Sequence, residues 1–166
     1  MYVPFDQLPD HARLWIYQAD RKLSEAEEQV ISEELSVFCA LWVAHGSPLN
    51  TSFRIERRQF LILAVDEGVT GASGCSIDGS VRLLKSLHER MGIDFLSHSR
   101  VPFLIDGEVT LIPVRELKEA FTAGILGPDT PTFHILAATK EVWQRSWILS
   151  AEKTWLAQYL PKTTVT

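Results

Sequence analysis

The sequence predicts an α+β fold with a mixed, mostly antiparallel sheet and helices on one face. Short apolar, β-branched runs alternate with two longer stretches of helical periodicity. A chain of 166 residues with a hydrophobic share of 46% suits one hydrophobic core. We therefore expect one domain over residues 1–166, with a core at about 13–112 and a C-terminal extension at about 113–160 packed on it.

The first two elements are a strand and a long helix. Residues 13–19 (RLWIYQA) are rich in aromatic and β-branched side chains, which favours a strand. Ser24 and Glu27 then have the spacing of a capping box, which satisfies two amide donors at a helix start. Apolar residues recur at helical spacing to about residue 45, where Gly46 and Pro48 can end the helix.

Two strands and a second helix come next. Residues 52–57 alternate between apolar and charged side chains, and residues 60–65 (FLILAV) are apolar on both faces. The pattern predicts a half-exposed strand, a turn at Arg57 and Arg58, and a central strand. A loop of small residues leads into a helix that Gly92 ends.

A hairpin and a helical tail complete the predicted elements. Asp106 and Gly107 separate strands at 100–105 and 108–112, because a type I′ turn needs positive φ at both central positions. Pro102 cannot donate to a ladder, so its strand is expected to begin there or lie at an edge. A helix at 114–122 and a tail with three buried tryptophans, Trp143, Trp147 and Trp155, follow. The first six elements have the order of a ferredoxin-like fold, β-α-β-β-α-β, which we retain as one option for the core.

Composition and charge exclude several classes of partner. A net charge of -5 repels phosphate backbones, so we expect no nucleic-acid partner, and the cluster Arg54, Arg57 and Arg58 is interpreted as a solvated hairpin edge. The start of the chain has no basic region followed by an apolar run, and no window approaches the about 18 apolar residues of a membrane span. We expect a cytoplasmic protein in which Cys39 and Cys75 are free thiols.

The strongest candidate site is the segment from Phe60 to Ser80. A strand ends in two carboxylates and passes through glycines into a helix start, where free amides and the helix dipole attract anions. The ligand-binding residues expected there are Asp66, Glu67, Gly74, Cys75, Ser76 and Asp78.

The same segment partly matches a nucleotide-binding site. FLILAVDE is similar to a Walker B strand, and Gly74 and Gly79 have the spacing of the Walker A glycines. Ser80 occupies the position of the phosphate-binding lysine, however, and Val81 that of the magnesium-binding hydroxyl. We therefore do not expect ATP hydrolysis.

Cys75 carries the alternative hypothesis of a cysteine-dependent enzyme or a redox thiol protein. A thiol near a helix start has its thiolate stabilised by the dipole, and Asp66 or a histidine brought near by folding could orient it. A buried small residue in a tight turn explains the same cysteine without catalysis.

Three aspartates are candidate metal ligands. Asp20, Asp66 and Asp106 each follow a predicted strand and would meet if those strands ended at one edge of a sheet. They are also common turn residues, and no spacing typical of a metal site accompanies them. We expect no metal and no cofactor.

Three segments resemble a small bacterial family without an assigned activity, whose members are often labelled ABC transporter ATPases. The likeness lies in Tyr2 to Leu23, Gln59 to Val81 and Phe103 to Lys118 and extends over nearly the whole length. The chain has neither the Walker A lysine nor the Leu-Ser-Gly-Gly-Gln signature that this label requires. The resemblance therefore implies no ATPase activity and no catalytic residue.

Taken together, the sequence predicts a cytosolic module that binds a small molecule or a protein partner through loop 66–80. A third hypothesis is a structural subunit that forms a homodimer.

Overall fold

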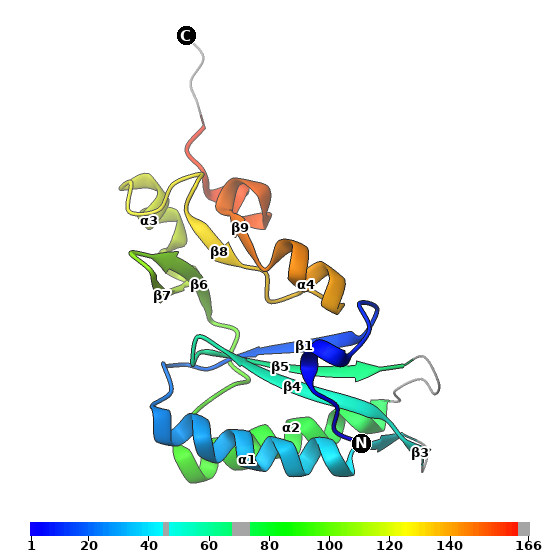
Figure 1. Ribbon diagram of the computed structural model, residues 1–166. Coiled ribbons are helices and arrows are strands. Elements are labelled where there is room, and N and C mark those ends of the chain that lie inside the picture. Colours follow the sequence, from blue (N-terminus) through cyan, green and yellow to red (C-terminus); the bar gives the residue numbers. More distant parts are fainter. Residues whose placement is uncertain (45–46, 68–73, 163–166) are drawn as a thin grey trace. The chain divides into compact units, whose positions relative to one another are not determined.

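The computed structural model describes residues 1–44, 47–67 and 74–162 (Figure 1). Within these ranges the chain forms two compact units. Unit 1 comprises Met1–Ser97 and Ile135–Arg145, and unit 2 comprises His98–His134 and Ser146–Thr166. Both units combine helices with antiparallel sheet, so the α+β class is confirmed.

Unit 1 is built around a three-stranded antiparallel sheet. Its strands β1 (Arg13–Gln18), β4 (Asn50–Glu56) and β5 (Phe60–Asp66) have the order β1-β5-β4. Strand β5 is central and buried from Phe60 to Val65, as its apolar run predicted. A short pair, β2 (Val43–Ala44) and β3 (Ser47–Pro48), lies outside this sheet.

The hairpin between β4 and β5 turns at Arg57 and Arg58, which both have positive φ, 53° and 52°. This is the predicted turn, formed without glycine. Arg58 is more than a solvated edge, because its guanidinium contacts Glu25 at 2.8 Å and Glu28 at 3.0 Å. The turn is thereby tied to the start of the first long helix.

Helices α1 (Glu25–Leu41) and α2 (Gly74–Met91) lie on the same side of this sheet (Figure 1). The capping box is present: Ser24 Oγ accepts from the Glu27 amide at 3.1 Å, and Glu27 accepts from the Ser24 amide at 2.9 Å. Apolar residues of both helices pack against alternate residues of β5 in one core; these are Ile31, Leu35, Leu84, Leu87, Leu61, Leu63 and Val65.

Helix α1 ends four residues before the predicted end at residue 45. Trp42 is already extended, with φ -71° and ψ 121°, and its amide bonds to the Cys39 carbonyl at 3.3 Å. The Trp42 ring is buried against Phe38 and Trp15. This aromatic packing turns the chain into β2 before it reaches Gly46 and Pro48, the residues predicted to end the helix. The predicted cap Gly46 lies outside the described residues.

The opposite face of the sheet is also covered, which corrects the expectation of helices on one face only. The 3-10 helix η1 (Phe5–Gln7) and α4 (Lys140–Ser146) contribute Phe5 and Trp143 to a second core with Ile62 and Ala64. Lys140 is 3% exposed, and its ammonium donates to the Asp6 carbonyl at 3.2 Å and the Leu8 carbonyl at 2.7 Å. This lysine anchors α4 to the N-terminal segment.

Unit 2 contains a four-stranded antiparallel sheet of order β7-β6-β8-β9. Its elements are β6 (Arg100–Ile105), β7 (Glu108–Pro113), η2 (Val114–Glu116), α3 (Leu117–Thr122), β8 (Pro131–Phe133), β9 (Ile148–Ser150), η3 (Ala151–Lys153) and η4 (Trp155–Tyr159). Asp106 and Gly107 both have positive φ, 51° and 78°, so the predicted type I′ turn is confirmed. Phe103, Leu117, Phe121 and Leu156 belong to the core of this unit.

Two expectations for these strands are wrong. A ferredoxin-like core would place the sixth element in the first sheet, but β6 pairs with β7 and β8 in the second sheet. Pro102 therefore sits in an inner strand. Strand β8 pairs with β6 only at Phe103, which limits the ladder bonds that Pro102 could disrupt.

The tail also differs from its expected place. Residues 135–145 belong to unit 1, whereas strand 100–105, hairpin strand 108–113 and residues 146–160 build unit 2. The predicted division into a core at 13–112 and an extension at 113–160 therefore does not follow the observed units. Trp155 is 51% exposed, against the expected burial, and packs edge-on against Tyr159 at 5.9 Å.

Candidate functional site

Strand β5 delivers two acidic residues to one end of the unit 1 sheet. Asp66 is its last residue and Glu67 follows it. Because β1 runs antiparallel to β5, with Arg13 opposite Val65, the residues just before β1 lie beside those just after β5. His11 and Arg13 are the two side chains that this register brings to the acids.

Both acids have basic partners. His11 Nε2 lies 3.3 Å from Asp66 Oδ1, and Arg13 Nη1 donates to Glu67 Oε1 at 3.1 Å. The His11 side chain is 70% exposed and that of Asp66 is 18% exposed. The Arg13 guanidinium also lies over the Trp15 ring, 4.7 Å from its centroid. The sheet end therefore presents paired charges of both signs at the surface rather than two solvated acids.

Sequence reasoning identified Asp66 and Glu67 but missed His11 and Arg13. No local motif marks them, because they are 55 and 54 residues away from their partners. The signal that could have found them is the antiparallel pairing of the first strand with the central strand.

Helix α2 begins at Gly74 and runs for 18 residues. Gly74, Cys75 and Ser76 occupy its first turn, where amides have no partner within the helix. No acidic residue lies in that turn to offset the dipole. The side chains of Cys75 and Ser76, and loop residues 68–73, lie outside the described part of the chain.

The later residues of the predicted site are less suited to binding. Asp78 is exposed, one turn into the helix. Ser80 is 1% exposed and its hydroxyl donates to the Ile77 carbonyl at 2.7 Å. Helix α2 contains Gly79, Ser80 and Val81, which therefore do not form a loop before the helix. Their amides are positioned to donate within the helix rather than to a phosphate.

The two cysteines have different surroundings. Cys39 is fully buried on α1, and this burial raises the pKa of its thiol to about 11. A thiol with that pKa is protonated and unreactive at neutral pH. Cys75 is therefore the cysteine on which any thiol chemistry of this chain would depend.

The three aspartates considered as metal ligands do not converge. Gln18 lies opposite Phe60 and Arg13 opposite Val65, so Asp20 and Asp66 stand at opposite ends of the β1–β5 pair. Asp20 instead accepts from the Asp94 amide at 3.0 Å, and Asp106 occupies the hairpin turn of unit 2. Within residues 1–44, 47–67 and 74–162, no three His, Cys, Asp or Glu side chains are grouped to hold a metal ion.

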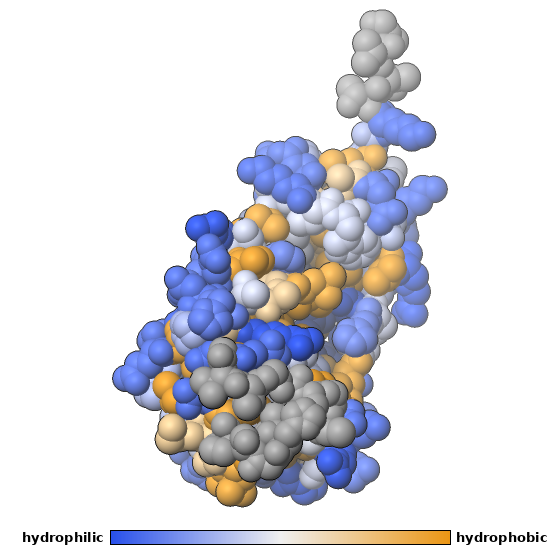
Figure 2. Space-filling model, turned by 90° about the vertical axis from the view of Figure 1, so that its right-hand side faces the viewer, coloured by the Kyte–Doolittle hydropathy of each residue, from blue (hydrophilic) through white to orange (hydrophobic). Residues whose placement is uncertain are grey.

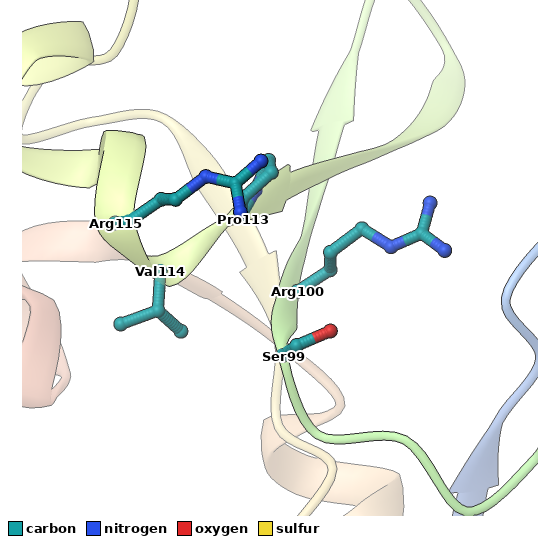
Figure 3. Close-up of a pocket in the computed structure, with 5 residues that line it drawn as sticks. All are labelled: Ser99, Arg100, Pro113, Val114 and Arg115. Carbon is teal, nitrogen blue, oxygen red and sulfur yellow. The ribbon is translucent and has the colours of Figure 1, made fainter.

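Unit 2 carries a hollow of about 630 Å³ at the base of the β6–β7 hairpin, lined by Ser99, Arg100, Pro113, Val114 and Arg115. The Val114 amide donates to the Ser99 carbonyl at 3.0 Å, which fixes the backbone there. Figure 3 shows Arg115 folded toward Pro113 and Arg100 extended away from the hairpin. Because the two guanidinium groups do not converge, this hollow is a weaker candidate for anion binding than the α2 start.

None of the helices in the described ranges has both the length and the hydrophobicity to cross a bilayer. Comparison of the chain with protein-family models, curated proteins and solved structures finds no match.

Proposed function

We propose that the chain is a cytosolic binding module that holds a small anionic molecule where β5 ends and α2 begins. The observation that carries the proposal is the first turn of α2, whose amides and positive dipole end face no acidic residue of that turn. His11 and Arg13 support it, since their contacts with Asp66 and Glu67 reduce the repulsion that these two carboxylates would exert on an anion.

Inorganic phosphate is the probe that tests this proposal. We expect phosphate to shift the backbone amide NMR signals of residues 74–77, because these amides have no helical acceptor. Ser76→Asp places a carboxylate in the same turn and should weaken phosphate binding about fivefold, while stabilising the helix through its dipole.

Ser86→Asp, in the C-terminal half of the same helix, is the matched control and should leave phosphate affinity unchanged. Equal affinities in Ser76→Asp and Ser86→Asp, or amide shifts confined to other segments, would contradict the proposed site. Shifts caused by an acidic peptide but not by phosphate would assign the surface to a protein partner.

A second candidate function is thiol chemistry at Cys75, favoured by the contact between His11 and Asp66. A carboxylate that holds one ring nitrogen of a histidine orients the ring as a base, which is the arrangement that activates thiols in cysteine enzymes. Residue 75 also stands in the first turn of α2, where the dipole stabilises a thiolate.

The rate of alkylation by iodoacetamide, measured against pH, tests this second function. Cys39 should not react with iodoacetamide, because burial raises the pKa of its thiol to about 11. The native protein should therefore be labelled at Cys75 alone. We expect an apparent pKa below the value of about 8.5 for a free thiol. His11→Gln should raise this pKa, and Cys75→Ser should abolish labelling. An apparent pKa at or above about 8.5 would remove the thiol hypothesis and leave the anion hypothesis intact.

A further inference from the structure

The backbone that carries His11 and Arg13 is held by a late segment of unit 1, residues 138–141, which we call the clamp. Arg13 forms an antiparallel bridge with Thr139 of the clamp. Three backbone hydrogen bonds join the clamp to residues 10–14; these are Leu14 amide to Ala138 carbonyl at 2.9 Å, Lys140 amide to Ala12 carbonyl at 2.9 Å, and Glu141 amide to Asp10 carbonyl at 2.8 Å. The chain is therefore fixed on both sides of His11.

The clamp leaves the side chains of His11 and Arg13 at the surface. Ala12 and Leu14, which alternate with them, are buried in the second core of unit 1. Figure 2 looks onto the end of the sheet at which β5 stops in Figure 1, and it shows hydrophilic atoms at the surface there. The clamp thus fixes the backbone from which the two basic side chains reach the two acids at the end of β5.

Lys140 adds a side-chain contact to the clamp. Its buried ammonium donates to the Leu8 carbonyl at 2.7 Å and to the Asp6 carbonyl at 3.2 Å. The same ammonium lies over the Phe5 ring, 5.5 Å from its centroid. Lys140 therefore holds the chain just before His11 from a position more than 100 residues away in the sequence.

Stability alone does not explain an ammonium at this place. Both of its acceptors are neutral backbone carbonyls, and burying a cation among neutral groups costs free energy. Replacing a buried charge by an apolar side chain of similar volume is often neutral or stabilising. What only the ammonium supplies is a pair of directed hydrogen bonds to the backbone before His11.

We propose that Lys140 is a positioning residue of the anion site and acts through His11 and Arg13. The inference rests on the proposed function, in which these two basic side chains offset the charges of Asp66 and Glu67. Without the ammonium, the backbone before His11 loses its fixed course and the basic side chains spend less time on the acids. The carboxylates then repel an incoming anion more strongly.

Phosphate affinity, measured from amide NMR shifts, tests the proposal. Lys140→Met matches the apolar stem of lysine without its donors and should weaken phosphate binding about threefold, because the acids regain part of their repulsion. Arg145→Met is the matched control, since it removes one positive charge from the same helix at a side chain that is 77% exposed, and it should leave the affinity unchanged. Circular dichroism checks folding. Lys140→Gln, too short to reach both carbonyls, is a second variant with the same expected loss.

A double-mutant cycle separates positioning from a general structural effect. In a protein that carries His11→Gln and Arg13→Gln, Lys140→Met should cause no further loss of phosphate affinity, because the groups through which it acts are absent. A loss that persists in that background, or an equal loss in Arg145→Met, would overturn the proposal.

The NMR signals of the His11 ring give a readout that needs no ligand. Asp66→Asn should shift these signals in the wild-type protein, and should shift them at least about threefold less in Lys140→Met, where the ring is less often at the carboxylate. Equal shifts in the two proteins would also overturn the proposal. If the wild-type protein does not bind phosphate, the proposed function fails, and the ring signals still decide the role of Lys140.

Discussion

The Glu27 carboxyl shows how one residue serves both a helix start and a tertiary contact. Two bonds from Arg21, at 2.8 and 2.6 Å, lower the pKa of Glu27 to about 2, with a further contribution from the Ser24 amide. The capping box was predictable from spacing alone. The Arg21 contact was not, because it depends on how the loop before α1 folds back on the helix.

Glu27→Gln should make the stability of unit 1 less dependent on pH. Glutamine keeps the capping bond but loses the ion pair, which costs about 0.5–1 kcal/mol for a partly exposed pair. Folding lowers the pKa of Glu27 from 4.5 to about 2. The stability that the ion pair adds to the wild-type protein is therefore fully present above the unfolded-state pKa of 4.5, and it is lost as the pH falls through the folded-state pKa of about 2.

Urea unfolding at a series of pH values measures this difference. Glu89→Gln, an exposed glutamate of α2, is the control and should show no such pH-dependent gap. If the wild-type protein were still more stable than Glu27→Gln at pH about 2, the ion pair would not be the source of the difference.

At the scale of elements, the same substitution should have opposite effects in two places. Gly79 lies inside α2, where an added Cβ would meet Phe38 at an ordinary 3.5 Å. Gly79→Ala should therefore stabilise the protein by about 0.5–1 kcal/mol. Gly107 has a φ of +78° in the β6–β7 turn, so Gly107→Ala should destabilise it by about 1 kcal/mol through backbone strain.

Denaturant unfolding of both variants checks the pair. The sign of the change in unfolding free energy is the result that matters for each variant. Destabilisation by Gly79→Ala would mean that Phe38 cannot accept the extra methyl group, and a neutral Gly107→Ala would mean that the hairpin turn can relax.

Local sequence predicted both elements, because capping residues, an apolar run and an Asp-Gly pair act over a few neighbours. It mispredicted the end of α1, where the buried ring of Trp42 decides the chain direction.

At the scale of the whole molecule, the two units have separate cores, which predicts separate opening. Leu35→Ala in unit 1 and Phe121→Ala in unit 2 each remove a buried side chain, at a cost of about 2–5 kcal/mol. Hydrogen exchange should accelerate in β5 and α1 for the first variant, and in β6 and α3 for the second. Acceleration throughout the chain by either variant would instead indicate the single cooperative domain that the sequence predicted.

The sequence by itself determined the elements whose causes are local: the capped start of α1, the buried run of β5, the turn at Asp106 and Gly107, and the acidic end of the central strand. Only the tertiary structure decided which strands share a sheet, that residues 135–145 join unit 1, and that His11 and Arg13 meet Asp66 and Glu67. The reason is that strand pairing depends on which edges remain free and on contacts between residues far apart in the chain, whereas a cap or a turn depends on its immediate neighbours.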